Sequence, residues 1–311
     1  MPKSMKKMIL LAKAEVTPGL DPVPTPALNA ILVRGMTPTP ISAEFVERNL
    51  LRGYKGNFGS LSVGVHRQFE CEVELAGSGA AGTAPKWAPL LQACGFSETL
   101  LATTSATYAP VSEAEPTLTM YGYLDGLLFK LTGAKGTVSF ELNAKNIPVM
   151  KFKFVGDYSA YTDVTFPTGA VFTGFTKPVT VSKVNTPTLT MFGFAAVCNA
   201  FGFDIANAVA YRDEINYQGA ESPDRKPVGT ATIELPTAAI ANFGEIARLN
   251  AESAVNLVHG TVAGNIIDIS MPNVQLNSPP TISNDGDKAR IGLQYSLNPS
   301  AGNDEVVIVV R

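Results

Sequence analysis

The sequence has few charged residues and few of the residue types that carry catalysis or bind metals. Asp, Glu, Lys and Arg make up 16% of the 311 residues, whereas about 25% is usual in soluble domains. There are two histidines, one tryptophan and three cysteines. A surface of low charge suits a subunit that buries much of itself against neighbours.

Strong positive charge and long apolar runs are also missing. The net charge of −3 and the pI of about 5.5 give no basic footprint for a nucleic-acid backbone, so any contact with DNA should be non-adhesive. No stretch approaches the roughly 18 apolar residues of a membrane span. The start, Met1 to Lys13, places three lysines before a short apolar run. That run is shorter than an export signal requires, and we interpret the segment as an amphipathic arm.

The cysteines and histidines do not form a site. Cys71, Cys94 and Cys198 are an odd number without metal-binding spacing, which favours free thiols in a reducing compartment. His66 and His259 are predicted in or beside turns without nearby ligands. A Cys94–His259 pair is the sole route to thiol catalysis, and Cys94 fits better as a buried small hydrophobe beside Leu90 and Leu91. We therefore expect no catalytic residue, no cofactor-binding residue, no metal ligand and no enzymatic activity.

Two short motifs resemble ligand loops only superficially. Gly77 to Gly82 has the glycines of a phosphate-binding loop but no following Lys-Ser or Lys-Thr and no parallel βαβ unit. Asp285-Gly286-Asp287 lacks the remaining residues of a calcium loop. We predict a flexible strand-to-helix connection for the first and a hairpin tip for the second.

Period-2 alternation dominates the chain and predicts strands. In the run from Gln68 to Leu75, apolar side chains alternate with charged or polar ones, as in a half-buried strand. The other segments with this pattern are Thr117 to Tyr123, Gly136 to Leu142, Val149 to Val155, Ala231 to Leu235, Ile266 to Met271, Arg290 to Leu297 and Glu305 to Val310. Only Pro85 to Cys94 and Ala238 to Asn250 have helical signals. The fold is therefore predicted to be mainly β, with one flanking α-helix in each half.

The order of elements is similar in the two halves, which predicts a duplicated β-sandwich. We expect an N-terminal arm over 1–26, a first sandwich over 27–156, an extended linker over 157–185 and a second sandwich over 186–311. The alignment places the following segments opposite each other: Asn29 to Val33 and Thr188 to Phe192, Glu72 to Leu75 and Thr232 to Leu235, Tyr121 to Gly126 and His259 to Gly264, and Val149 to Phe154 and Ala289 to Gln294. Polar loops at Gly53 to Arg67 and Asn216 to Lys226 also correspond.

A second likeness between the halves does not fit this alignment. Pro116 to Tyr123 nearly copies Pro187 to Phe194. Because the alignment assigns these two segments to different strands, we treat their likeness as chance. Two unrelated β-domains are the alternative to a duplication.

The run from Phe69 to Phe96, FECEVELAGSGAAGTAPKWAPLLQACGF, resembles the corresponding stretch of tail tube proteins from long-tailed, siphophage-like bacteriophages and prophages. The resemblance covers almost the whole chain. It extends through Asn29 to Val33, Tyr123 to Gly126, Lys130 to Gly136, Leu257 to Thr261, Gly264 to Ile266 and Ser300 to Glu305.

The resemblance implies a structural virion protein of the tail, assembled in the bacterial host cytoplasm, that polymerises into stacked rings and guides DNA during ejection. Implied partners are the protein itself, a tape measure protein in the lumen, and tail terminator and distal tail or baseplate proteins at the ends, with non-specific passage of phage DNA and no membrane. The duplicated length favours trimeric over hexameric rings. The alternative is a carbohydrate- or receptor-binding β-sandwich module of a fibre or adhesin, which needs exposed aromatics at loop tips, whereas Trp87 is expected to pack on the sheet.

Overall fold

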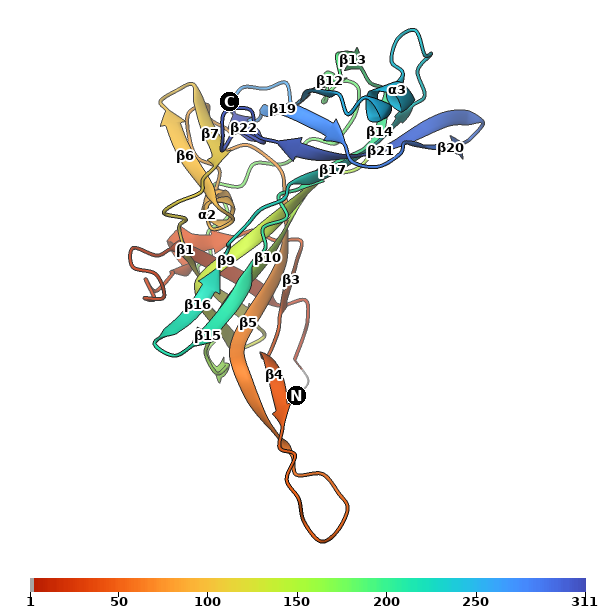
Figure 1. The fold of residues 1–311 in the computed structure, drawn as a ribbon. Coiled ribbons are helices and arrows are strands. Elements are labelled where there is room, and N and C mark those ends of the chain that lie inside the picture. The colour runs from red at the N-terminus through yellow and green to blue at the C-terminus, as the bar shows by residue number, and fades with distance from the viewer. Residues whose placement is uncertain (1–2) are drawn as a thin grey trace.

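The computed structural model describes residues 3–311 and is mostly β, as the alternating pattern predicts (Figure 1). The elements of the first half are β1 (Met8–Ala14), α1 (Pro26–Asn29), β2 (Ala30–Ile31), β3 (Gly35–Pro38), β4 (Ser42–Glu47), β5 (Ser60–Glu74), α2 (Ala88–Gln92), β6 (Phe96–Leu101), β7 (Ser105–Pro110), β8 (Leu118–Leu124), β9 (Leu127–Asn143), β10 (Val149–Tyr158) and β11 (Thr162–Asp163). The elements of the second half are β12 (Thr188–Met191), β13 (Phe194–Ala195), β14 (Cys198–Asp204), β15 (Ala210–Glu214), β16 (Tyr217–Glu221), β17 (Val228–Glu234), α3 (Phe243–Arg248), β18 (Glu252–His259), β19 (Ile267–Leu276), β20 (Thr281–Asp285), β21 (Lys288–Asn298) and β22 (Val307–Val310).

The strands of the two halves follow one order. In the first half the antiparallel order is β1, β8, β9, β10, β5, β3. In the second half it is β12, β18, β19, β21, β17, β14. Strands β5 and β17 therefore occupy the same place in their sheets, as the predicted repeat requires.

A shared irregularity supports the repeat. The register between β8 and β9 shifts between Leu118 and Met120, and the register between β18 and β19 shifts between Ser253 and Val255. Bulges of this kind bend a strand and are kept where the shape of the sheet depends on them. In each half the extra residue lies in the equivalent strand, β9 or β19, and at the same position along it.

The predicted alignment was wrong in register at several strands. Residues 188–191 pair with β18 as β1 pairs with β8, so they correspond to β1 and not to Asn29–Val33. The buried faces of β10 and β21 align Phe152 with Leu293, one residue away from the predicted match. Leu124 and His259 are equivalent, three residues from the predicted match.

The near-copies at 116–123 and 187–194 occupy non-equivalent strands, because β8 pairs with β1 whereas β12 pairs with β18. Their likeness is therefore no part of the repeat, as predicted. The helices α2 and α3 are present but shorter than predicted, and α1 is a further single turn that the sequence patterns did not indicate.

The N-terminal segment contains an integral strand, which corrects its interpretation as an arm without a core. Strand β1 pairs along its whole length with β8, and Leu10 and Leu11 are fully buried. Glu15, just after β1, accepts hydrogen bonds from the hydroxyls of Thr117 and Thr119 and from the amide of Gly133. The lysines before this strand and the prolines after it are typical of an arm without a core, so the sequence did not indicate a strand here.

The two halves share one sheet and one core. At its C-terminal end β9 leaves β8 and pairs with β14, from Asn143–Ala200 to Ser139–Asp204, and Phe140 stacks on Phe203 with ring centroids 4.4 Å apart. A second link is formed by β22, which pairs with β7 of the first half. Figure 1 shows the two sheets meeting at these strands.

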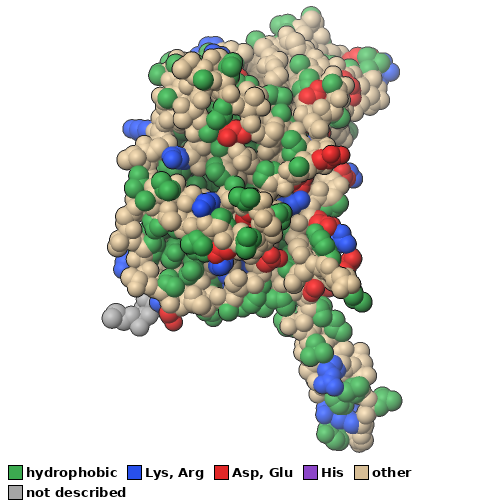
Figure 2. Space-filling model, turned by 90° about the vertical axis from the view of Figure 1, so that its left-hand side faces the viewer, with side chains coloured by type: hydrophobic (Ala, Val, Ile, Leu, Met, Phe, Trp, Pro, Cys, Tyr) green, Lys and Arg blue, Asp and Glu red, His purple; other side chains and the backbone are tan. Residues whose placement is uncertain are grey.

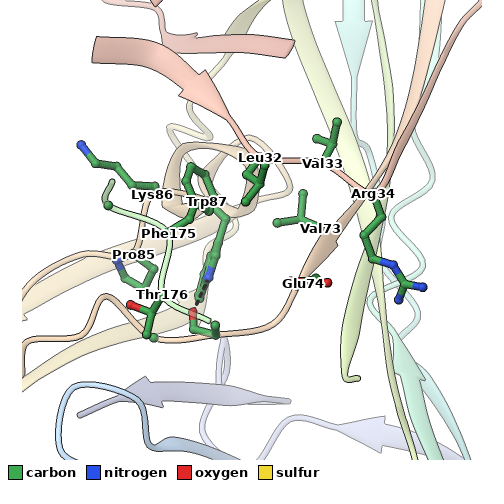
Figure 3. A pocket seen from close by; sticks show the side chains of 13 residues that line it. Leu32, Val33, Arg34, Val73, Glu74, Pro85, Lys86, Trp87, Phe175 and Thr176 are labelled. Carbon is green, nitrogen blue, oxygen red and sulfur yellow. Dashed lines mark hydrogen bonds between the residues drawn. The ribbon is translucent and has the colours of Figure 1, made fainter. Parts of the chain in front are cut away.

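The segment between β11 and β12 runs over both halves without forming a strand. Figure 3 shows Phe175 and Thr176 from this segment beside Trp87, where they line a cavity of about 210 Å³ with residues around β5. Trp87 is 2% exposed and its indole N–H donates to the carbonyl of Ala76 at 2.8 Å. The tryptophan therefore packs on the sheet, as predicted.

The glycine-rich loop at 77–82 is an internal contact. The amide of Gly77 donates to Asn265 Oδ1 at 2.7 Å, and the amide of Gly79 donates to the carbonyl of Gly264 at 2.9 Å. A Cβ atom on Gly264 would lie 2.4 Å from the Ala80 nitrogen. The glycines thus let two backbones from different halves touch.

We expect Gly264→Ala to lower the free energy of unfolding by about 3 kcal/mol, combining left-handed backbone strain with overpacking. Gly286→Ala is the matched control, because Gly286 also has a positive φ (55°) but no atom within 4 Å of its Cβ position. That control should cost about 1 to 2 kcal/mol. Urea unfolding measures the loss of unfolding free energy in both variants. Equal losses would show that the contact between Gly264 and the loop at Ala80 does not contribute to stability.

Candidate functional site

The histidines have structural roles. His66 stacks on Tyr211 with ring centroids 5.1 Å apart, and its Nδ1 lies 2.7 Å from the carbonyl oxygen of Gly64. His66 lies within β5, whereas His259 ends β18 beside the following turn, as expected, and is 1% exposed. No group of three or more His, Cys, Asp or Glu side chains within residues 3–311 is placed to hold a metal ion.

Burial keeps the thiols protonated. Cys71 and Cys94 are both buried, and burial raises the pKa of Cys71 to about 12 and that of Cys94 well above its ordinary value. Burial also raises the pKa of Cys198 to about 11. The thiolate is the reactive form, so these cysteines are poorly suited to nucleophilic chemistry.

The Asp285-Gly286-Asp287 motif is the tip of the β20–β21 hairpin, as predicted. Gly286 and Asp287 both have positive φ angles, 55° and 64°, which is the backbone of a two-residue hairpin turn.

A continuous polar face lies across both halves. Strands β3, β5, β10, β9, β14, β17, β21 and β20 follow one another in one sheet, and side chains alternate between its buried and its polar face. The charged residues on the polar face include Glu70, Glu72, Glu74, Glu141, Asp157, Asp204, Glu234 and Asp285, and Lys135, Lys151, Lys153, Lys288 and Arg290.

The cations of this polar face are paired with carboxylates, and Lys135 pairs with Glu115 outside the face at 2.8 Å. Lys151 pairs with Glu141, and Lys153 lies 3.7 Å from Glu70. Lys288 and Arg290 both lie 3.4 Å from Glu234. Pairing lowers the attraction of these cations for an external polyanion, because phosphates would have to displace the carboxylates.

A long hairpin, formed by β4 and the first part of β5, leaves the body of the protein. Figure 2 shows hydrophobic and basic side chains gathered on it. Leu50, Leu51 and Tyr54 are exposed at its tip, and Arg52 lies over the Tyr54 ring at 4.4 Å from the centroid. Exposed apolar side chains in this number mark a contact surface.

The predicted loop at Gly53–Arg67 is therefore only partly a loop. Its residues from Ser60 onward are strand β5, and the true tip covers residues 48–59. Leu61, Val63 and Val65 do alternate here with polar residues or glycine, as in a strand, but Gly53, Gly56, Gly59 and Gly64 favoured the interpretation as a loop.

The predicted loop at Asn216–Lys226 is also largely strand, since Tyr217–Glu221 form β16 and pair with β15. This hairpin is inserted between β14 and β17, as β4 is inserted between β3 and β5. It folds back on the first half, where Tyr211 donates to Asp157 at 3.0 Å and Asp213 accepts from the amide of Gly64 at 3.1 Å. The short β15–β16 hairpin therefore packs against the base of the long hairpin.

A family model described as phage tail tube protein matches residues 6–298. No curated protein sequence matches the chain. Within residues 3–311 no helix is both long and apolar enough to cross a membrane.

His259 should make stability depend on pH. The Val179 carbonyl can only accept, so His259 Nε2, 3.2 Å away, carries the proton and Nδ1 accepts from the Thr186 hydroxyl at 2.8 Å. Burial lowers the pKa of His259 below its ordinary 6.5, so the unfolded chain binds the proton more readily. The stability from neutral His259 is therefore complete above about pH 6.5 and is lost as the pH falls through the folded pKa.

We expect this contribution to fall by at most about 1.4 kcal/mol per pH unit. Urea midpoints measured between pH 7.5 and 5 test the effect, and His259→Gln should flatten the decline in that range. His66→Gln is the control and should keep the wild-type decline. Parallel curves for wild type and His259→Gln would contradict the assignment.

Proposed function

The chain belongs to the phage tail tube protein family, and we propose that its copies form closed rings that stack into a tube through which DNA leaves the phage. The observation that carries this proposal is the repeated strand order of the two halves, joined through β9 and β14 into one sheet. A subunit that already contains two equivalent units, joined edge to edge through one sheet, has the form of a ring segment.

We propose that three copies make one ring, which then contains six similar units. We propose that the two units are those expected from the sequence, 27–156 and 186–311, with β1 added to the first. A closed ring also satisfies the general preference of homo-oligomers for cyclic symmetry.

The polar face of the shared sheet is proposed to line the lumen. Its excess of carboxylates and its paired cations give a wall that does not hold phosphates. Unpaired Lys and Arg would release counterions and bind DNA without regard to sequence, which would slow its passage.

The long β4–β5 hairpin is proposed to contact the next ring. Its tip has more exposed apolar surface than an isolated two-stranded ribbon tolerates. The short β15–β16 hairpin supports the base of the long hairpin through Tyr211 and Asp213.

The remaining partners follow from the tube itself: a tape measure protein in the lumen, and terminator and distal tail proteins at its ends. Protonated, unpaired cysteines agree with assembly in the host cytoplasm. We propose a structural role without catalysis. The carbohydrate-binding alternative has less support, because Trp87 is buried.

Removing the hairpin tip should abolish stacking without unfolding the subunit. Arg48 and Gly59 are linked by a backbone hydrogen bond of 3.2 Å, so an Asn-Gly turn can replace residues 49–58. We expect negative-stain microscopy to show tubes for the wild type and only single rings for the shortened variant, with an unchanged melting temperature.

Two milder double variants distinguish the loss of apolar side chains at the hairpin tip from the same loss elsewhere on the surface. Leu51→Ser with Tyr54→Ser should reduce tube length at a given concentration, whereas Val16→Ser with Val184→Ser, equally exposed but outside the hairpin, should not. Normal tubes from the shortened variant would contradict the stacking role.

Reversing charge on the polar face should make the tube retain DNA. Glu141→Lys with Asp204→Lys adds cations and frees Lys151 from its partner. We expect assembled variant tubes to bind short duplex DNA with an affinity that falls steeply as salt rises, whereas wild-type tubes bind little. Glu98→Lys with Glu252→Lys, outside this face, is the control. Equal DNA binding by both variants would exclude the polar face from the lumen.

A further inference from the structure

We infer that the outer edge of β20 in one copy pairs, antiparallel, with the outer edge of β3 in the next copy, and that this ladder closes the ring. The inference rests on the proposed ring. Within residues 3–311, β3 pairs with β5 alone and β20 with β21 alone. Both strands therefore have a free edge, and these edges lie at opposite ends of the shared sheet.

The repeat shows what each free edge is equivalent to. Strand β14 pairs with β17 as β3 pairs with β5, so β14 corresponds to β3. In this correspondence Phe201 is equivalent to Met36, and both are buried. The hairpin of β20 and β21 corresponds to the hairpin end of β9 and β10, which makes Ile282 equivalent to Phe140. The contact of β9 with β14 is thus the internal copy of a contact between β20 and β3.

The internal contact fixes the register. Phe140 pairs with Phe203 and Leu142 with Phe201, so the repeat assigns Ile282 to Pro38 and Asn284 to Met36. Between these two pairs, Ser283 lies opposite Thr37.

The backbone groups of both edges point outward at the required residues. Asp285 pairs with Lys288 across a two-residue turn, so Asp285 and Ser283 bond to β21, and Ile282 and Asn284 face away. On the other strand, the amide of Thr39 donates to Gln68 of β5 at 2.9 Å, so Met36 and Pro38 face away. Only the Pro38 position lacks a donor.

Side chains at the two edges are also complementary. Ile282 is 69% exposed, although its equivalent Phe140 is buried against Phe203. Next to Pro38 of a second copy, Ile282 would be covered as Phe140 is. The same register brings Arg34, which pairs with Glu72 of its own copy at 3.1 Å, near Asp285 of the other copy, which pairs with Arg290 at 3.3 Å.

Engineered cysteines test the register. Thr37 and Ser283 form a non-hydrogen-bonded pair, with Cα atoms about 4.5 Å apart, within disulfide range. In a Cys198→Ser background, Thr37→Cys with Ser283→Cys should give covalent trimers on a non-reducing gel when assembled rings are oxidised. Mixing the two single-cysteine variants should give dimers only.

A slipped pair is the matched control. Thr37→Cys with Ile282→Cys places the thiols on opposite faces, so we expect at least tenfold less cross-linking. Tubes that stay uncross-linked with the first pair, or cross-link equally with both, overturn the inference while the proposed function stands. Absence of tubes from the wild-type protein would instead overturn the proposed function.

A backbone variant covers the case in which cysteine itself disturbs assembly. Asn284→Pro removes the outward amide, whereas Asn284→Ala keeps it. We expect the alanine variant to form rings as the wild type does and the proline variant to stay monomeric in sedimentation, with the same far-ultraviolet circular dichroism. Ring formation by a folded proline variant would overturn the inference.

Discussion

The antiparallel ladder between β9 and β14 is the contact on which the rest of the structure depends. It joins strands about sixty residues apart in sequence, stacks Phe140 on Phe203, and makes one sheet from two. Because the ladder holds the two units in a fixed relation, the polar residues of eight strands form a single face. Without it, the polar face would be divided between the two halves.

Other contacts hold the same two units together from different sides. The Gly77–Gly82 loop meets the turn at Gly264 and Asn265, and β22 completes a sheet with β7. Arg225 reaches from the second half to the carbonyl of Val111 at 2.6 Å, while it is paired with Glu305. Buried ion pairs of this kind favour one arrangement over others more than they add stability. The relation between the halves is therefore defined at several separate points.

The sequence was sufficient for local features and insufficient for the pairing of distant ones. Alternation at Phe69–Leu75 predicted a half-buried strand because one side of that strand meets the core. Alternation does not specify which neighbour a strand takes, and a shift of one residue exchanges its faces. The alignment of β10 with β21 was wrong by that one residue.

Strand β1 and the base of the long hairpin were also missed. β1 lies among lysines and prolines, and its apolar run has no alternation of period two. The hairpin base does alternate at Leu61, Val63 and Val65, but its glycines are typical of a loop. The predicted absence of a ligand site rested on missing residue spacings. The assembly surfaces had no spacing rule to reveal them, since an edge becomes visible only when the sheet order is known.

Pro38 has a consequence for the time before assembly. A strand with a complete row of free amides is a template for any other exposed strand, and crowded, newly made chains aggregate through such edges. Pro38 interrupts that row on β3, so random strands gain an incomplete ladder there. The missing donor at Pro38 therefore makes the β3 edge selective about the strand that it accepts.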